Sequence, residues 1–250
     1  MPQNVFVGPI ARRYDAGLGD MADAALLART ADVLAELAGT GGALEFAIGT
    51  GRVALPLAAR GVQVAGLEIS EDMVAELRAK PGGSEIPVTI GDMSATRVAG
   101  TFDLVYLVFN SIGNLLTQAE QVACFRNAAA HLGPGGRFLV ELGVPDLRRM
   151  PPGQTSCPFD IAPEHLGFDT YDFADQHLTS HHVWFDGSEC VRFDSHHRYA
   201  WPAELDLMAQ LAGMDLVHRW ADWERSPFTG ESRSHVSVWA RGTDGDGGTR

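Results

Sequence analysis

Short apolar runs alternate with helical segments through residues 43–142, and this alternation dominates the pattern of the chain. The apolar runs cover residues 43–48, 62–69, 88–90, 102–109 and 137–142. Continuous runs of Val, Ile and Leu separated by helices are typical of parallel strands whose sheet is covered on both faces. The pattern therefore predicts an α/β fold built on a doubly wound, mostly parallel sheet.

Signals at the helix ends agree with this prediction. Residues 20–38 carry apolar side chains at helical spacing and Gly39 follows as a stop, which predicts an amphipathic helix. Ser70 is a helix cap that precedes two acidic residues in the first turn. Thr117 and Glu120 form a capping box ahead of another helix.

The pattern changes after the fifth apolar run. Residues 143–163 are rich in proline and show no period, which predicts an ordered loop or cover. Residues 166–201 alternate apolar and polar positions, with a turn at Asp186-Gly187, which predicts antiparallel strands with one buried face. A helix over residues 202–212 begins with proline and ends before Gly213.

Two more strands are expected near residues 216–220 and 235–240, which brings the predicted sheet to seven strands. The domain organisation follows from these elements. We expect residues 1–142 and 201–241 to form the core and residues 143–200 to form an antiparallel β insertion after the fifth strand. The insertion is expected to cover the substrate site, and residues 242–250 to be a disordered tail.

Composition narrows the range of partners. The chain has 250 residues, with 19 Lys and Arg against 32 Asp and Glu, a formal net charge of -13. Such a surface repels phosphate backbones, so we expect a small-molecule ligand and no nucleic acid. No apolar run approaches the ~20 residues that span a bilayer, and the start lacks a secretory pattern. These features predict a cytoplasmic protein without a membrane partner.

The cysteines give no sign of a structural role. Cys124, Cys157 and Cys190 are widely spaced and form no CxxC pair. We expect them to be reduced thiols, because neither a disulfide framework nor a zinc site has this spacing.

A glycine-rich turn follows the first predicted strand and opens a helix. The backbone N–H groups at such a helix start bind negative or polar groups. Gly49, Gly51 and Ala54 fit the dinucleotide fingerprint, and Glu68 ends the second strand, where an acidic residue binds a ribose diol. NAD and S-adenosylmethionine both contain that ribose, so the turn and Glu68 predict a nucleoside cofactor without choosing between them.

Three further features favour S-adenosylmethionine. Glu45 ends the first strand, where its charge would repel a pyrophosphate and attract a sulfonium and an ammonium. Asp92 ends the third strand and can accept a hydrogen bond from the exocyclic amine of adenine. Phe109, Asn110 and Ser111 end the fourth strand, where substrate and transferable group are expected to meet.

Four segments resemble motifs I to IV of class I S-adenosylmethionine-dependent methyltransferases in order and spacing. These segments are residues 45–51, Glu68, residues 91–93 and residues 102–105. Within that superfamily, Tyr14-Asp15, residues 109–115 and the predicted insertion resemble small-molecule enzymes such as the aminosugar N-methyltransferases. The resemblance implies a Rossmann-like methyltransferase fold and S-adenosylmethionine as the cofactor. It also implies methyl transfer to N or O of a small metabolite.

The resemblance implies a cofactor site and a set of catalytic candidates. The cofactor site would comprise Glu45, Ala47, Gly49, Gly51, Glu68, Ile69, Met73, Asp92, Met93 and Phe109. The catalytic candidates are Tyr14, Asn110 and Asn114. Tyr14 would cover the methionine end of the cofactor or orient the acceptor. Arg52 could pair with the cofactor carboxylate or with Glu45, or it could simply be solvated.

Two residues depart from the family pattern. Ala47 stands at the first glycine of the usual G-x-G-x-G, which the turn tolerates if its φ stays below zero. Asn114 stands where the N-methyltransferases often carry histidine, which leaves the identity of a base open.

The inserted strands carry five histidines that could supply such a base, namely His177, His181, His182, His196 and His197. Adjacent histidines on a strand point to opposite faces, so His181 with His182 is no simple ligand pair and we expect no metal site. Four tryptophans fit a substrate clamp and core packing equally well, namely Trp184, Trp201, Trp220 and Trp223.

Two alternatives to a methyltransferase stay open at this point. A Rossmann domain with the same glycine turn could belong to an NAD-dependent oxidoreductase. A non-catalytic S-adenosylmethionine-binding protein would keep the cofactor residues and lack an acceptor cavity. The oligomeric state is also open, with a homodimer as one candidate.

Overall fold

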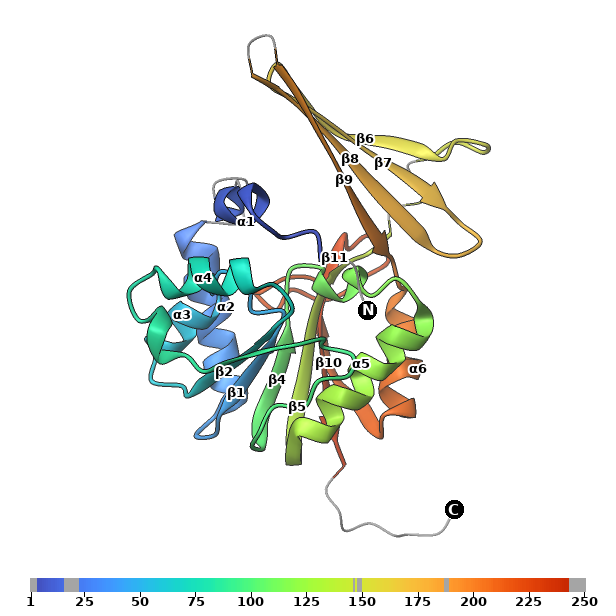
Figure 1. Cartoon of the computed structure of the whole chain (residues 1–250). Helices are drawn as coiled ribbons and strands as arrows, with labels where there is room; N and C mark the ends of the chain where they lie inside the picture. Colours follow the sequence, from blue (N-terminus) through green and yellow to red (C-terminus); the bar gives the residue numbers. More distant parts are fainter. Residues whose placement is uncertain (1–3, 16–22, 146, 148–149, 187–188, 243–250) are drawn as a thin grey trace.

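The computed structural model describes residues 4–15, 23–145, 147, 150–186 and 189–242. Two sheets form its framework, as Figure 1 shows. The larger sheet has seven strands in the order β10-β11-β5-β4-β1-β2-β3. Its strands are β1 (Ala43–Phe46), β2 (Val64–Glu68), β3 (Val88–Ile90), β4 (Phe102–Leu107), β5 (Leu132–Gly143), β10 (Met214–Trp220) and β11 (Ser234–Arg241). Only β11 runs antiparallel to its neighbours β5 and β10, so the predicted mostly parallel sheet is confirmed.

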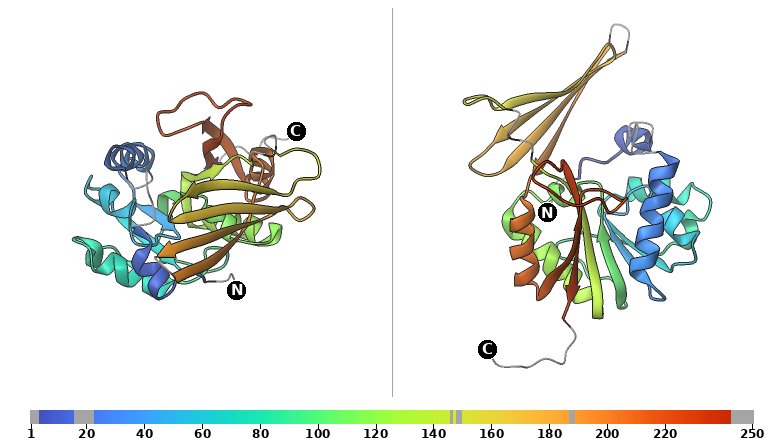
Figure 2. Two further views of the ribbon diagram at one scale, coloured as in Figure 1. Left: turned by 90° about the horizontal axis from the view of Figure 1, so that it is seen from above. Right: turned by 180° about the vertical axis from the view of Figure 1, so that it is seen from behind.

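Helices cover both faces of this sheet, as the right-hand view of Figure 2 shows. Helices α5 (Gln118–His131) and α6 (Pro202–Leu211) pack on one face through residues such as Phe125 and Leu205. Helices α2 (Ala24–Ala38), α3 (Ala54–Ala58) and α4 (Glu71–Arg78) pack on the other face. The doubly wound architecture therefore buries the apolar strands between two helical layers.

Three short helices complete the described part of the core, namely α1 (Pro9–Arg13), η3 (Gly83–Glu85) and η4 (Ser111–Asn114). The predicted caps are confirmed, because Ser70 accepts the N–H of Met73 and Thr117 forms a capping box with Glu120. No helix in the described residues is long and apolar enough to cross a membrane. The three cysteines are unpaired thiols.

The second sheet lies between β5 and α6 in the chain, where the insertion was predicted. Its antiparallel strands pair in sequence order, namely β6 (Ser156–Ala162), β7 (His165–Asp172), β8 (His177–Asp186) and β9 (Glu189–Arg198). Figure 1 shows this small sheet standing over one end of the larger sheet, with α1 at the same end, above α4.

Strand β6 corrects one prediction, because it lies inside residues 143–163, which were expected to form a loop or cover. β6 is an edge strand, and its pairing with β7 shifts register between Pro158 and Asp160. Proline is tolerated at such a position because an edge strand with a register shift does not need every N–H. The prolines therefore mask the strand pattern in the sequence, although the strand forms by pairing with β7.

The start of the fifth strand also differs from expectation. The apolar run predicts a strand that starts at residue 137, yet β5 begins at Leu132, which pairs with Phe102 ahead of a register shift. Gly135 has a φ of 73°, which lets the backbone absorb that irregularity. The predicted turn at Asp186-Gly187 and the predicted tail fall largely on residues 187–188 and 243–250, which lie outside the described residues.

Candidate active site

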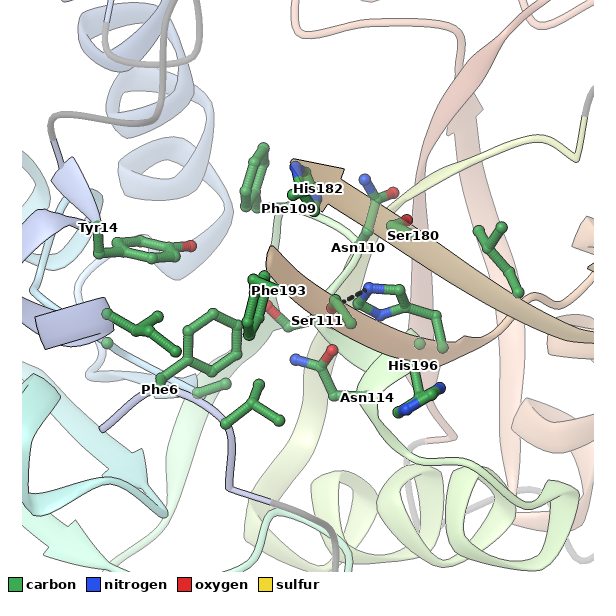
Figure 3. Close-up of a pocket in the computed structure, with 18 of the residues that line it drawn as sticks. Phe6, Tyr14, Phe109, Asn110, Ser111, Asn114, Ser180, His182, Phe193 and His196 are labelled. Atoms are coloured by element: carbon green, nitrogen blue, oxygen red, sulfur yellow. Dashed lines mark hydrogen bonds between the residues drawn. The ribbon is translucent and has the colours of Figure 1, made fainter. Parts of the chain in front are cut away.

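A cavity of about 1630 Å³ lies between the two sheets and the N-terminal segment. Figure 3 shows its lining: Phe6 and Tyr14 from the N-terminal segment, Phe109, Asn110, Ser111 and Asn114 from the end of β4 and η4, and Ser180, His182, Phe193 and His196 from the small sheet. Residues far apart in the sequence therefore enclose one space at the carboxyl edge of the parallel strands. This edge is where α/β sheets bind their ligands.

One face of the small sheet lines this cavity, and we call it the cavity face. It consists of alternate residues on three strands, as the strand period of two requires. These residues are Asp169, Tyr171, Leu178, Ser180, His182, Trp184, Val191, Phe193, Ser195 and His197. Asp169, Ser180 and Ser195 lie directly opposite one another on adjacent strands.

Glu68 ties the glycine turn to the end of β2. Its Oε2 accepts the N–H of Gly49 at 2.8 Å, and its Oε1 accepts the N–H groups of Ile69 and Ser70, both at 2.9 Å. Only 6% of Glu68 is exposed, and this burial raises the pKa of its carboxyl group. The predicted ribose-binding residue is thus held rigidly by three backbone donors.

Ala47 corrects the expectation that its φ stays below zero, because the φ is 53°. Gly49 and Gly51 in the same turn have φ values of 56° and 75°. The turn therefore needs left-handed backbone at Ala47 as well, which costs an L-residue about 1–2 kcal/mol. The substitution of alanine for the family glycine leaves a strained residue at the cavity wall.

Glu45 and Gly51 were expected in the cofactor site, but neither is among the described residues that line the cavity. Glu45 lies behind the turn, where its Oε2 accepts the hydroxyl of Tyr106 at 2.8 Å. With 3% of the residue exposed, burial raises the pKa of Glu45 to about 8, against the smaller opposing effects of Tyr106 and Arg52. At neutral pH its carboxyl group is therefore mostly protonated.

The other predicted cofactor residues line the cavity, namely Ala47, Gly49, Glu68, Ile69, Met73, Asp92, Met93 and Phe109. Asp92 is held by the next turn, because its Oδ1 accepts both the N–H and the hydroxyl of Ser94, each at 2.8 Å. This leaves Oδ2 of Asp92 as the oxygen available to a ligand. The structure thus brings together residues that the sequence separates by more than sixty positions.

The turn after β4 is strained at two consecutive residues. Phe109 and Asn110 have φ values of 59° and 57°, which bulky residues rarely adopt. The N–H of Phe109 donates to Oε2 of Glu141 at 3.0 Å, and Oδ1 of Asn110 accepts the N–H of Gly143 at 2.6 Å. Backbone strain held in this way is common where a ligand must be positioned.

Sequence reasoning missed Glu141, which supports this turn from β5. Its Oε1 accepts the indole N–H of Trp223 at 2.8 Å, so Trp223 is a core residue and not part of a substrate clamp. An acidic residue inside the apolar run 137–142 was the available signal. Of the four tryptophans that were considered, Trp184 lines the cavity.

Tyr14 lines the cavity next to Phe6, with the two ring centroids 5.5 Å apart in an edge-on arrangement. Burial raises the pKa of Tyr14 to about 12, so its phenol keeps its proton and can donate a hydrogen bond into the cavity. The guanidinium of Arg52 lies over the ring of Phe109, 4.8 Å from its centroid. Tyr14 and Phe109 thus each contribute an aromatic ring to the lining of the cavity.

Three of the five histidines considered as a base line the cavity, namely His182, His196 and His197. His181 faces the other side of the sheet, where its Nδ1 lies 2.8 Å from Oδ1 of Asp194. The prediction that His181 and His182 point to opposite faces is therefore confirmed. The described residues contain no group of three or more His, Cys, Asp or Glu placed to hold a metal ion.

His197 lies where β9 meets η4, close to Gly113. Its Nε2 lies 2.6 Å from the hydroxyl of Ser195. Burial lowers the pKa of His197 to about 4, so its ring is uncharged at neutral pH. His197 can therefore take part in hydrogen bonds to a ligand but is a weak proton acceptor.

Known proteins resemble this chain both within its core and over nearly its whole length. Residues 43–136 match a family model described as a methyltransferase domain. The chain is 37% identical to the CcbJ methyltransferase from Streptomyces caelestis, with a TM-score of 0.84. That similarity covers 94% of this chain and 96% of the CcbJ chain, so it includes the small sheet.

Two curated relatives extend the comparison. The cypemycin N-terminal methyltransferase of a Streptomyces species is 25% identical over 201 residues, which is 79% of this chain and 82% of the relative. The dTDP-3-amino-3,6-dideoxy-alpha-D-glucopyranose N,N-dimethyltransferase of Streptomyces fradiae is 36% identical over 149 residues, which is 56% of this chain and 55% of the relative.

Proposed function

Because this chain belongs to the class I S-adenosylmethionine-dependent methyltransferases, we propose that it methylates the nitrogen of an amine on a small metabolite. Family membership makes the nucleoside cofactor S-adenosylmethionine and the protein an enzyme. The NAD-dependent oxidoreductase and the non-catalytic binding protein are therefore no longer alternatives.

One observation carries the choice of an amine: the described residues of the cavity face offer proton and hydrogen-bond acceptors, while Arg198 of β9, which also lines the cavity, is paired with Glu204. The titratable groups of the cavity face are Asp169, Tyr171, His182 and His197, and burial lowers the pKa of both histidines. An acceptor that arrives as an ammonium ion is attracted by a carboxylate and needs an uncharged base to lose its proton.

Asp169 is the carboxylate of that face. Its Oδ1 accepts the hydroxyl of Ser180 at 2.7 Å, and burial raises the pKa of Asp169 above its ordinary value. A half-buried carboxylate is stabilised by a cationic partner, because the opposite charge offsets the loss of hydration. We assign Asp169 as the group that attracts the ammonium of the acceptor.

The cofactor residues suit S-adenosylmethionine in their hydrogen-bonding capacity. A carboxylate has about four lone-pair sites, and three backbone N–H groups occupy three of those of Glu68. One site on Oε2 is left for a ribose hydroxyl. We assign Oδ2 of Asp92 to the exocyclic amine of adenine and the backbone N–H of Met93 to a ring nitrogen.

We assign the roles of the remaining cofactor residues by their positions around the cavity. Ile69, Met73 and Met93 supply apolar surface to the adenosine, and the turn from Ala47 to Gly49 lies beside the methionine part. We assign Glu45 and Gly51, which do not line the cavity, the role of supporting the shape of that turn without touching the cofactor. Tyr14 donates its phenol hydrogen toward the methionine part or the acceptor.

The chemistry that S-adenosylmethionine supplies when bound is a methyl group on a positively charged sulfur. The chain has to align an uncharged nitrogen with that methyl group and exclude water. We assign the alignment to the turn at Phe109 and Asn110 and to the amide of Asn114, since all three residues line the cavity. We assign the exclusion of water to the small sheet, as the cover of the acceptor site.

The names of the two curated relatives support nitrogen as the methylated atom. One relative is named as an N-terminal methyltransferase and the other as an N,N-dimethyltransferase of an amino sugar nucleotide. Hydroxyl groups beside the amine of a sugar-like acceptor would find partners in Ser180 and Ser195 on the cavity face. We therefore propose a hydroxylated amine, such as an amino sugar derivative, as the substrate class.

The test uses matched pairs of amino sugars and the same sugars with hydroxyl in place of the amino group. Each compound is incubated with the enzyme and S-adenosylmethionine carrying a deuterated methyl group, and products are identified by mass spectrometry. We expect labelled methylamine products from the amino compounds and none from the hydroxyl compounds. Methylation of the hydroxyl compounds alone would contradict the proposal.

A further inference from the structure

A chain of three hydrogen-bonded side chains runs from the surface of the small sheet into the cavity. Oδ2 of Asp160 lies 2.6 Å from Nδ1 of His165, and Nε2 of His165 lies 3.0 Å from Nδ1 of His182. The side chain of Asp160 is 46% exposed and that of His165 is 9% exposed. His182 lines the cavity, as Figure 3 shows.

The first hydrogen bond determines the tautomers of both rings. An ionised carboxylate only accepts, so His165 must donate Nδ1–H to Asp160. In an uncharged His165, Nε2 then carries a lone pair and must accept Nδ1–H from His182. Nε2 of His182 is therefore left without a hydrogen and available as a base.

Ring packing holds the chain in this geometry. Trp184 stacks on His165 with centroids 3.9 Å apart, and His165 stacks on His182 at 5.2 Å. The rings of Phe159 and Phe193 lie 5.2 Å and 5.9 Å from His182. Both imidazoles are thus held in place by aromatic neighbours.

The charged groups around His182 come from each neighbouring strand. Burial lowers the pKa of His182, and the neighbouring rings of His165 and His181 add to that effect. The carboxylates of Asp160 and Asp194 act in the opposite direction. His182 is therefore uncharged at neutral pH, while an imidazolium formed there is stabilised through His165 by Asp160.

The other histidine on the cavity face lacks this support. Nε2 of His197 is hydrogen-bonded to Ser195, which carries no charge to stabilise an imidazolium. His181 has a carboxylate partner in Asp194 but lies on the opposite face. Only His182, of the histidines in the described insertion, combines a carboxylate-backed hydrogen-bond chain with a place on the cavity wall.

We propose that Nε2 of His182 takes the proton from the acceptor ammonium, with His165 and Asp160 as positioning residues that hold its tautomer. This inference rests on the proposed function and adds the proton path to it. The N–H bond of the ammonium breaks, its electron pair stays on nitrogen, and the proton bonds to Nε2. That pair then forms the bond to the methyl carbon as the carbon–sulfur pair goes to sulfur. His182 afterwards returns its proton to solvent.

The tautomers are tested first, in the enzyme bound to S-adenosylhomocysteine without any acceptor. Nitrogen-15 NMR of the imidazole rings should show Nδ1–H on both His165 and His182. In Asp160→Ala the carboxylate acceptor is gone, so both rings are expected to change to Nε2–H. A hydrogen on Nε2 of His182 in the unaltered enzyme would overturn the proposal.

The pH dependence of turnover is tested next, with an amino sugar that the matched-pair assay identifies. His182→Gln should lower kcat/KM about 100-fold at neutral pH, and the loss should shrink as the pH rises toward the pKa of the free amine. Asp160→Ala should lower it about tenfold. His181→Gln is the matched control, because the adjacent histidine has its own aspartate on the other face, and it should keep the original pH profile.

Two results would overturn the proton path: an unaltered pH profile in His182→Gln, or an equal loss in His181→Gln. Affinity for S-adenosylhomocysteine, measured by calorimetry, should be unchanged in all three variants and shows that they are folded. Absence of turnover with every amine would refute the proposed function. The tautomers decide independently whether the hydrogen-bond chain exists, so the two failures are distinguishable.

Discussion

The two halves of the cavity hold their polar groups by different means. In the cofactor half, the backbone N–H groups of Gly49, Ile69 and Ser70 converge on one carboxylate, that of Glu68. In the small sheet, side chains bond to side chains across strands, as in the pair Ser180 and Asp169. Backbone donors cannot rotate away, whereas a hydroxyl or an imidazole can turn to another partner.

The difference suits the two ligands. A cofactor that is the same in every turnover is served by a rigid cradle with no reorganisation on binding. An acceptor that must enter, lose a proton and leave is served by side chains that exchange partners and protons. The contrast leads to three predictions, which compare the cost of equivalent changes in the two halves.

Glu68→Gln should give the largest loss of stability. The amide NH₂ of glutamine would face N–H donors, which leaves at least one buried donor without an acceptor and lowers the free energy of unfolding by about 3 kcal/mol. Ser180→Ala removes a hydrogen bond from the small sheet and should cost about 1 kcal/mol, because Asp169 can turn to water in the cavity. Urea unfolding of both variants measures the difference, and equal losses would remove the distinction between the halves.

The free energy of unfolding should depend on pH through Glu45, in the cofactor half. The pKa of Glu45 is about 8 in the folded protein against an ordinary value of 4.5, so between these values the unfolded chain is ionised while the folded one still holds its proton. The stability that protonated Glu45 contributes is complete below 4.5 and is lost as the pH rises toward 8. Unfolding free energy should therefore fall by roughly 3 kcal/mol more in the parent than in Glu45→Gln between pH 5 and pH 8. Parallel pH curves would contradict this assignment.

The smallest effect concerns strain in the turn. Ala47→Gly should stabilise the protein by up to about 1 kcal/mol, because glycine adopts a φ of 53° without steric cost. The same substitution at Ala43, which is buried in extended backbone of β1, should destabilise it. Thermal melts would then shift in opposite directions, by roughly 2–4 °C each. Shifts in the same direction would show that Ala47 is not strained.

Local features of the molecule could be predicted from the sequence. The caps at Ser70 and Thr117, the glycine turn and the acidic residue that ends β2 each depend on residues a few positions apart. The alternation of apolar runs was sufficient for the seven-stranded sheet and for the place of the insertion. Their physical causes, hydrogen-bond capping and burial of a strand between helical layers, act over short stretches of chain.

Features that depend on pairing between strands could not be predicted in this way. β6 forms because it pairs with β7. Pro158 interrupts the alternation of apolar and polar residues by which a strand is recognised in the sequence. The bond between His165 and His182 depends on the register of β7 with β8, where His165 lies opposite Trp184. The positive φ of Ala47 follows from the closure of the turn on β2 and not from the preference of alanine.

The central claim, that the core binds the donor and the small sheet handles the acceptor, is tested most directly by calorimetry with S-adenosylhomocysteine. The dissociation constant is measured for the parent, Glu68→Gln and His182→Gln. We expect Glu68→Gln to bind at least about tenfold more weakly, through a lost charged hydrogen bond, and His182→Gln to match the parent. Weakening of His182→Gln by the same factor, or parent-like binding by Glu68→Gln, would contradict the account.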